Sequence, residues 1–323
     1  MKTLDTLLVP IDGSDASAAA IEYAFQLAST KGAGITFCHS VDPSAVQRSP
    51  YDVGGMGAMI EQIEQVSTSL LAAAKAKADA RGIAASTLEL RGPAIAAIVD
   101  AARQRGVSAI VMGTAGRSGA SRFFLGSVTE GVLRSSDRPV FTISRWQPDA
   151  VEQPLYLKRI VVAVDESEAS NAAIELALPL ADSTHTTVEL VHILHAPATR
   201  AAVEPNGKGQ QRLIRECAQA EELLQTYSER FSERNIHVER TMKDGDPAAE
   251  IVAIASHERA DLIVIGTHGR RGLQRLVLGS VAEHVVRGAS VPVAVVPLTS
   301  VTAKVGAPEI RPGRSRRVAC SGA

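Results

Sequence analysis

Short apolar runs alternate with amphipathic segments along the chain. Residues 4–12, 35–41, 86–90, 109–112 and 139–143 are rich in Leu, Val and Ile, which is typical of parallel strands buried on both faces. Helical periodicity follows Ser14, continues over a long stretch ending near residue 81, returns briefly from Pro93 to Ile98, and covers residues 127–135. This alternation predicts an α/β fold with a doubly wound, mostly parallel sheet.

The same alternation recurs from Lys158 onward, and one sequence motif occurs twice. Residues 109–128 (AIVMGTAGRSGASRFFLGSV) and 262–281 (LIVIGTHGRRGLQRLVLGSV) agree at 12 of 20 positions and lie 153 residues apart. The same offset pairs Asp12 with Asp165 and His39 with His192. A constant register over long units indicates a duplicated domain, each copy having its own core.

The boundaries follow from local composition. The stretch QPDAVEQPLYL has two prolines and no periodicity, so we expect a linker at 147–157 between a first domain at 1–146 and a second at 158–298. Residues 299–323 are rich in Gly, Pro, Ser and Arg, which predicts a disordered basic tail.

The long helix of the second half has apolar positions at alternating steps of four and three. They are Leu213, Cys217, Ala220, Leu224, Tyr227 and Phe231. This stripe predicts a core-facing side, and a partner helix is the alternative.

Charge and cysteine content narrow the functional classes. The net charge of −1 argues against a general nucleic-acid binder, although the tail carries +4 and the remainder −5. The three cysteines do not occupy matching positions in the two halves, form no metal-ligand pattern and suggest no disulfide framework. The first residues lead almost at once into an apolar strand, so we expect no signal peptide. No apolar run approaches the roughly 20 residues that span a membrane, so we expect a cytoplasmic protein.

The glycine-rich pattern suggests a phosphate site. Gly113 and Gly116 follow a strand, where positive φ and close backbone approach are expected, and Gly126-Ser127 begins a helix whose N–H groups favour an anion. Nearby arginines could neutralise a triphosphate; they are Arg117, Arg122, Arg270, Arg271 and Arg275. Neither a P-loop sequence nor a strand-following G-x-G-x-x-G occurs. The glycines could instead serve only tight strand–helix turns.

The spacing G-T-x-G-R, then nine residues from the second glycine to Gly-Ser, resembles the ATP-binding signature of the universal stress protein family. The opening V-P-I-D-G-S and the G-D-P-A at 245–248 are similar to that family as well. The resemblance covers about 290 residues. It implies two tandem Rossmann-like domains, each with five parallel strands in the order 3-2-1-4-5, that bind ATP in stress response or signalling.

The resemblance also implies binding residues. The strand-1 aspartates would hold ATP, the adenine would lie near Val41 or Leu194, and the phosphates would rest on the glycine motif. In the first half the implied residues are Pro10, Asp12, Val41, Met112, Gly113, Gly116, Arg117, Gly126, Ser127, Val128 and Thr129. In the second half they are Asp165, Leu194, Ile265, Gly266, His268, Gly269, Arg270, Gly279, Ser280 and Val281. A Mg²⁺ ion would be held mainly by the phosphates, without protein metal ligands.

Single residues also have plainer explanations. Asp12 could cap the first helix, although Ser14 is better placed, and Ser127 and Ser280 could be simple N-caps. His39 and His192 lie within strands, where a hydrogen-bonded histidine is expected more often than a catalytic base. Thr129 becomes Ala282, which could weaken the second site, whereas the second half matches the family better at Gly245–Ala248. We therefore expect two sites of unequal affinity, and the sequence does not rank them.

Three functions remain open. Phosphoryl transfer needs positioned charge and an oriented nucleophile, and no duplicated carboxylate stands beside the glycine loop. The first hypothesis is therefore an ATP-binding protein with slow or no hydrolysis. An ATP-using enzyme, such as an ATPase or nucleotidyl transferase, is the second, and a protein-interaction module with vestigial motifs is the third. Single-domain relatives dimerise through their last strands, so 140–143 and 293–296 are expected to form the seam of an intramolecular pseudo-dimer. A further homodimer stays open.

Overall fold

The computed structural model describes residues 4–42, 56–114, 125–144, 157–194, 208–267 and 278–298. The first half contains β1 Thr6–Pro10, α1 Asp15–Lys31, β2 Gly34–Val41, α3 Met56–Asp79, β3 Ala85–Arg91, α4 Ala94–Gln104, β4 Ala109–Gly113, α5 Ser127–Ser135 and β5 Val140–Ile143. The second contains β6 Arg159–Ala163, α6 Glu168–Leu180, β7 Thr187–Leu194, α8 Lys208–Ser232, β8 His237–Asp244, α9 Pro247–His257, β9 Leu262–Gly266, α10 Ser280–Gly288 and β10 Val293–Val296.

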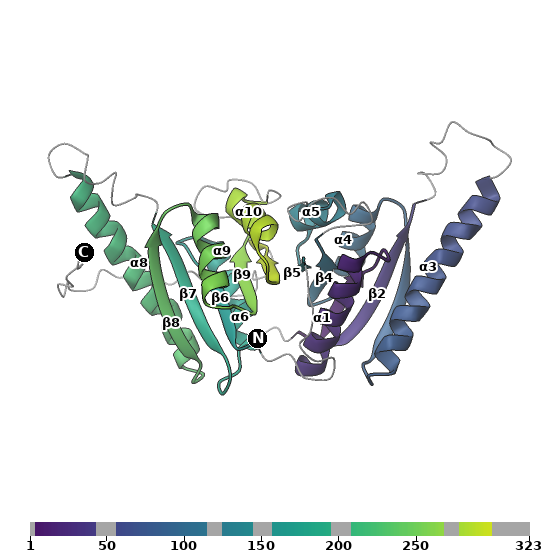
Figure 1. The fold of residues 1–323 in the computed structure, drawn as a ribbon, viewed down its shortest axis with the longest axis horizontal. Helices are drawn as coiled ribbons and strands as arrows, with labels where there is room; N and C mark the ends of the chain where they lie inside the picture. Colours follow the sequence, from purple (N-terminus) through teal and green to yellow (C-terminus); the bar gives the residue numbers. More distant parts are fainter. Residues whose placement is uncertain are drawn as a thin grey trace.

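All ten strands form one sheet in the order β3-β2-β1-β4-β5-β10-β9-β6-β7-β8. Within each half the strands are parallel and follow the predicted order 3-2-1-4-5. The two halves meet where β5 pairs antiparallel with β10. The doubly wound fold and the seam through the last strands are therefore confirmed (Figure 1).

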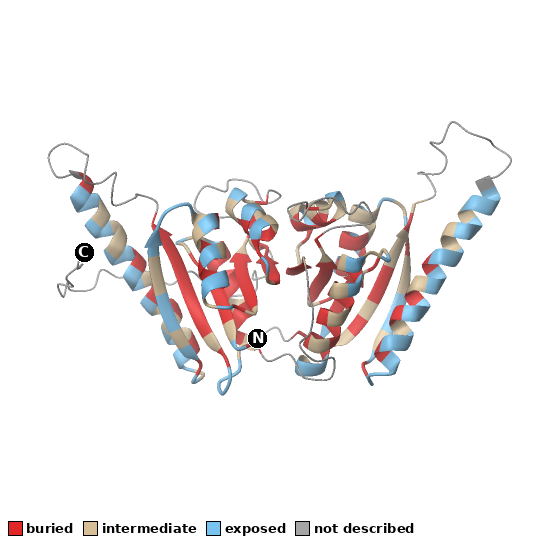
Figure 2. Ribbon diagram, viewed as in Figure 1, coloured by how far each residue is buried: buried red, intermediate tan, exposed pale blue. Residues whose placement is uncertain are grey.

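Two apolar layers cover the sheet and continue across the seam. One layer packs α1, α3, α6 and α8 against one face, and the other packs α4, α5, α9 and α10 against the opposite face. Strand residues such as Leu7, Ile110 and Ile160 are fully buried, as their continuous apolar runs predict. In Figure 2 the inner strands are mostly buried, whereas the edge strand β8 and the outer sides of α3 and α8 are more exposed.

Two helix predictions need correction. The short helix expected to end at Ile98 continues to Gln104, because Val99 and Ala102 extend its buried stripe. The stripe on α8 is buried at Ala220, Leu224, Tyr227 and Phe231, as predicted, but Leu213 and Cys217 nearer the start are only half-buried. The start of α8, like that of α3, lies toward the outer end of the molecule (Figure 1).

The predicted linker lies almost entirely outside the described residues, and so does the predicted tail after residue 298. Among the described helices, none is long and apolar enough to cross a membrane.

Candidate nucleotide site

The candidate site lies at the carboxyl edge of the sheet, between β1 and β4. These strands are neighbours in the sheet. The strand that follows β1 in the chain, β2, lies on one side of the pair, and the strand that follows β4, β5, lies on the other side. Such a reversal is the topological switch point at which doubly wound sheets bind ligands. β6 and β9 form the same arrangement in the second half.

Asp12 follows β1 and is held by the start of α1. Its Oδ1 accepts hydrogen bonds from the Ser14 amide at 2.9 Å and the Ser14 hydroxyl at 2.6 Å. Ser14 in turn is the N-cap of α1, accepting from the Ser17 amide at 3.2 Å. The prediction that Ser14, rather than Asp12, caps the helix is confirmed. Asp12 is half-buried, with its orientation fixed by these bonds.

Asp165 is held in a similar way. Its Oδ1 accepts from the Ser167 amide at 3.0 Å, from the Ser167 hydroxyl, and from the Ser170 hydroxyl at 2.8 Å. Ser167 is the N-cap residue of α6, although its side chain makes no capping bond. Both halves therefore present a half-buried, oriented carboxylate at the same edge.

The duplicated histidines fix the adjacent backbone. His39 Nδ1 lies 2.6 Å from the Ile11 carbonyl oxygen, and His192 Nδ1 lies 2.9 Å from that of Val164. Because a carbonyl only accepts, Nδ1 carries the proton in both rings. The expectation of hydrogen-bonded strand histidines is confirmed, and each ring ties the second strand of its half to the residue before the aspartate.

The helices α5 and α10 start at the same edge without a side-chain cap. Their N-cap residues are Gly126 and Gly279, so the suggestion that Ser127 and Ser280 are N-caps is wrong. The Gly126 amide donates to Thr114 O at 2.7 Å, and the Gly279 amide donates to Thr267 O at 2.6 Å. The next three amides of each helix have no acceptor within the helix. They belong to Ser127, Val128 and Thr129, and to Ser280, Val281 and Ala282.

Gly113 and Gly266 have a packing role, and the positive φ expected at Gly113 is wrong. Their contact with a phosphate stays a prediction. Each is the last residue of its strand, and positive φ occurs instead at glycines such as Gly13 and Gly92. A Cβ built on Gly113 would lie 2.6 Å from the Ala16 carbonyl carbon, and one on Gly266 would lie 2.5 Å from the Ala169 Cβ. These glycines therefore let the first helix of each half pack directly on the strand end.

Other predicted residues line the same edge. Pro10, Met112 and Ile265 end or nearly end their strands, and Val41 and Leu194 are the last residues of β2 and β7. Val41 and Leu194 are buried, at 1% and 8% exposed. Gly116, Arg117, His268, Gly269 and Arg270 fall outside the described residues, so the middle of each glycine loop is not placed.

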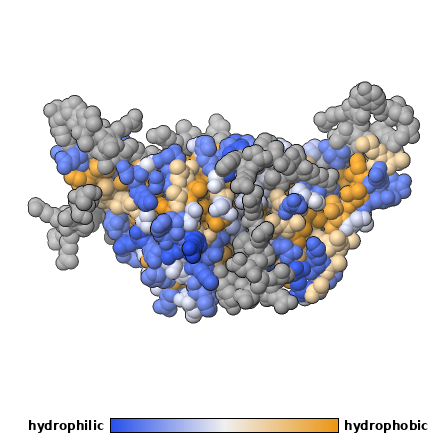
Figure 3. All heavy atoms as spheres, viewed as in Figure 1, coloured by the Kyte–Doolittle hydropathy of each residue, from blue (hydrophilic) through white to orange (hydrophobic). Residues whose placement is uncertain are grey.

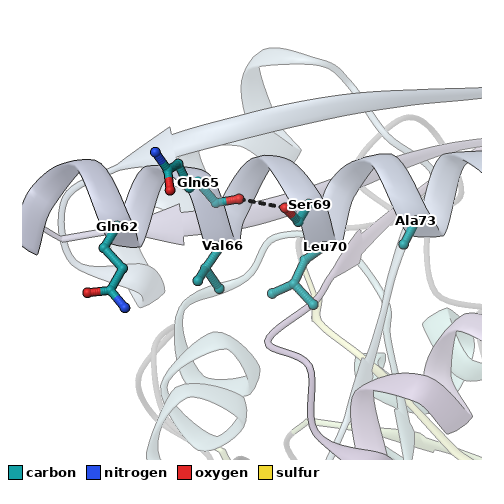
Figure 4. Close-up of a pocket in the computed structure, with 6 residues that line it drawn as sticks. All are labelled: Gln62, Gln65, Val66, Ser69, Leu70 and Ala73. Atoms are coloured by element: carbon teal, nitrogen blue, oxygen red, sulfur yellow. Dashed lines mark hydrogen bonds between the residues drawn. The ribbon is translucent and has the colours of Figure 1, made fainter.

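The described residues line two cavities elsewhere. One, of about 510 Å³, lies along α3 and is lined by Gln62, Gln65, Val66, Ser69, Leu70 and Ala73. Figure 4 shows Gln62, Val66, Leu70 and Ala73 on one side of that helix, and Figure 3 shows apolar atoms gathered along the same helix, on the right. Leu70 links this groove to the candidate site, since its Cδ2 would lie 3.3 Å from a Cβ on Gly13.

The second cavity, of about 600 Å³, includes Arg159 at the opposite, amino edge of the second half. Arg159 Nη1 lies 3.3 Å from Glu189 Oε2, 2.6 Å from Glu239 Oε2 and 3.5 Å from Glu258 Oε2. The three carboxylates are close enough to hold a metal ion, but the guanidinium already stands among them. The hydrogen bond and charge of Arg159 lower the pKa of Glu239. Sequence reasoning missed this cluster because its members are far apart in the chain.

The sequence profile of the universal stress protein family matches residues 3–144 and 157–297. The chain belongs to the universal stress protein family. A universal stress protein of Mycolicibacterium smegmatis is 28% identical over 298 residues, which cover 90% of this chain and 96% of that protein. One of Methanocaldococcus jannaschii is 34% identical over 140 residues, covering 43% of this chain and 81% of the relative.

A solved structure supports the tandem fold. The universal stress protein from Archaeoglobus fulgidus superposes with a TM-score of 0.68 and 24% identity, covering 91% of this chain and 97% of that one. The universal stress protein described here therefore shares its fold with that protein over most of both chains. The family resemblance expected from the motif is therefore confirmed, with two domains in one chain.

Proposed function

We propose that each half of this universal stress protein binds ATP at the carboxyl edge of its sheet, and that the protein acts in stress response or signalling with slow or no hydrolysis. One observation carries the proposal. In both halves a helix start without a side-chain cap and an oriented aspartate meet at the topological switch point, where the family's ATP signature stands.

The division of roles follows from the chemistry of each group. The first amides of α5 and α10, with the helix dipole, suit the phosphates. Asp12 and Asp165 are fixed acceptors suited to hydroxyl or amino donors of a nucleoside. A Mg²⁺ ion would be held mainly by the phosphates themselves. The glycine-loop residues Gly116 and Gly269 would complete the phosphate contacts.

The test is a calorimetric titration of Mg-ATP into nucleotide-stripped protein, comparing wild type with Ser127→Asp/Ser280→Asp. Both serines are exposed first residues of their helices, where a carboxylate favours the helix but repels a phosphate. We expect a stoichiometry approaching two for wild type, and affinity lowered by about tenfold or more in the variant.

A matched control adds the same charge elsewhere. Gln104→Glu/Ser256→Asp places two carboxylates at exposed positions near the ends of α4 and α9, at the opposite edge of the sheet. This control should bind like wild type. No binding by folded wild type, or unchanged binding by the serine variant, would refute the proposal. Rapid phosphate release or transfer to an acceptor would instead favour an ATP-using enzyme.

A further inference from the structure

Thr129 ties the proposed phosphate helix to the sheet. It is the third residue of α5 and only 4% exposed, and its hydroxyl donates to the Gly113 carbonyl at 2.7 Å. Gly113 is the last residue of β4. Together with the bond from the Gly126 amide to Thr114 O, this hydroxyl fixes the first turn of α5 to the strand end at two points. Thr129 points inward, so it acts on a phosphate only through the amides that it positions.

The second half lacks one of these two ties. The Gly279 amide makes the equivalent bond to Thr267 O at 2.6 Å. The residue that matches Thr129 is Ala282, which is buried at 2% exposed but has no hydroxyl to offer to Gly266. Of the two ties described for α5, α10 therefore keeps only the bond at the helix start.

This difference between the halves affects binding. Ordering the amides when a ligand binds costs free energy, and that cost lowers the affinity. Amides that are already fixed in the bound geometry bind a phosphate without a further loss of conformational entropy. A single hydrogen bond of this kind corresponds to a change of up to about tenfold in an equilibrium constant. The extra tie in the first half should therefore increase affinity for the phosphates of the nucleotide.

The charged residues beside the two sites also differ. The residue after Asp12 is Gly13, with φ of +82°, whereas the residue after Asp165 is the exposed Glu166. The second half thus has an additional carboxylate after its aspartate, which repels a polyphosphate. At an exposed position this repulsion is modest and weakens as salt is added. The glycine loop of the second half also has Arg271 where the first half has Ser118. Charge therefore does not rank the two sites, and the ranking rests on Thr129.

We infer that the two sites are unequal and that the first half binds nucleotide polyphosphates more tightly than the second. Thr129 is the positioning residue that accounts for the larger part of this difference in affinity. This inference rests on the proposed function, since it ranks the two sites which that proposal describes. It concerns the phosphates, so adenosine should bind the two halves more evenly than ATP does.

The ranking is tested in full-length proteins with one blocked site each. Ser280→Asp leaves the first site open, and Ser127→Asp leaves the second. Titration with Mg-ATP should give a dissociation constant about tenfold lower for Ser280→Asp than for Ser127→Asp. Equal constants, or the reverse order, would overturn the inference while leaving the proposed function intact. Absence of binding in both proteins and in wild type would refute the proposed function, and the inference with it.

Further substitutions assign the cause. In the Ser280→Asp background, Thr129→Val should weaken ATP binding several-fold and Thr129→Ser should restore it, because serine keeps the hydroxyl. In the Ser127→Asp background, Ala282→Thr should strengthen ATP binding, and so should Glu166→Gln, the latter only at low salt. Adenosine affinity should be unchanged by Thr129→Val. An equal loss for adenosine and ATP would show a general structural effect and overturn the positioning role.

Discussion

At the residue scale, Gly113 and Gly266 let the first helix of each half pack directly on a strand end. The motif predicts close backbone approach at Gly113, and the structure has such an approach to the Ala16 backbone of α1. Contact of the same glycine with a phosphate stays a prediction, because a glycine is compatible with both partners. The sequence likewise suggests Ser127 as an N-cap, but in the structure Ser127 is the first residue of the helix, directly after the N-cap Gly126.

Alanine at either strand-end glycine should therefore lower stability in itself. Gly113→Ala and Gly266→Ala place a Cβ within 2.6 Å and 2.5 Å of α1 and α6 atoms, so we expect overpacking to cost about 1–3 kcal/mol in the free energy of unfolding. Urea denaturation measures it. Gly57→Ala is the control, because a Cβ there meets nothing within 4 Å and alanine favours the helix. Equal stability of all three variants would contradict the packing role.

At the scale of elements, the apolar periodicity predicts the existence and order of the described strands and helices. The bounds of α5 agree with the predicted 127–135, since Gly126 and the buried Val132 and Leu133 mark them clearly. The predicted end of α4 at Ile98 was wrong, because Asp100 and Arg103 interrupt the apolar pattern without interrupting the helix. The cluster around Arg159 was not predictable, because β6, β7, β8 and α9 bring its members together only after folding.

That cluster predicts a pH dependence of stability. Arg159 lowers the pKa of Glu239 below its ordinary value of 4.5, so the carboxylate stabilises the fold above that pH, and the contribution is lost as the pH falls through the lowered pKa. Glu239 is largely exposed, so Glu239→Gln should cost at most about 1 kcal/mol at pH 7. Thermal unfolding should show this cost shrinking below pH 4.5.

A matched control separates this effect from loss of charge alone. Glu233→Gln removes an exposed carboxylate of the same half, just after α8. It should change stability less than Glu239→Gln at pH 7. A cost of Glu239→Gln that stays constant from pH 7 to strongly acidic pH would contradict the ion-pair explanation.

At the scale of the whole molecule, the duplication explains the seam. Residues 140–142 pair with 293–295 so that each residue faces a position near its own repeat partner, with Phe141 opposite Ala294 at the centre. Above the seam, four side chains of α5 and α10 form a ring in which charges alternate, with N–O distances of 2.9–3.3 Å; they are Glu130, Arg134, Glu283 and Arg287. The seam could be predicted from the resemblance, but the ring required the relative placement of the two halves.

The seam, rather than the connection between domains, should hold the halves together. Besides the paired strands and the ring, Thr142 Oγ1 donates to Val293 O at 3.1 Å, and Lys31 Nζ donates to Leu180 O at 3.1 Å. We therefore expect that a protein carrying an inserted protease site at residue 150 will elute as one particle after cleavage. Size-exclusion chromatography with light scattering measures this, and separation of the cleaved protein into half-size particles would contradict it.

The charged ring offers a reversible way to weaken that association. Arg134→Glu/Arg287→Glu places four carboxylates of α5 and α10 against one another, so the cleaved protein should separate at low salt and less so at high salt. Adding Glu130→Arg/Glu283→Arg reverses every charge and restores the alternation, so this fourfold variant should elute again as one particle. If the fourfold variant stayed apart while the folded halves were intact, the ring's contribution would lie in its particular geometry rather than in charge complementarity. Restoration would show that opposite charges across the pseudo-twofold seam are what the two helices require.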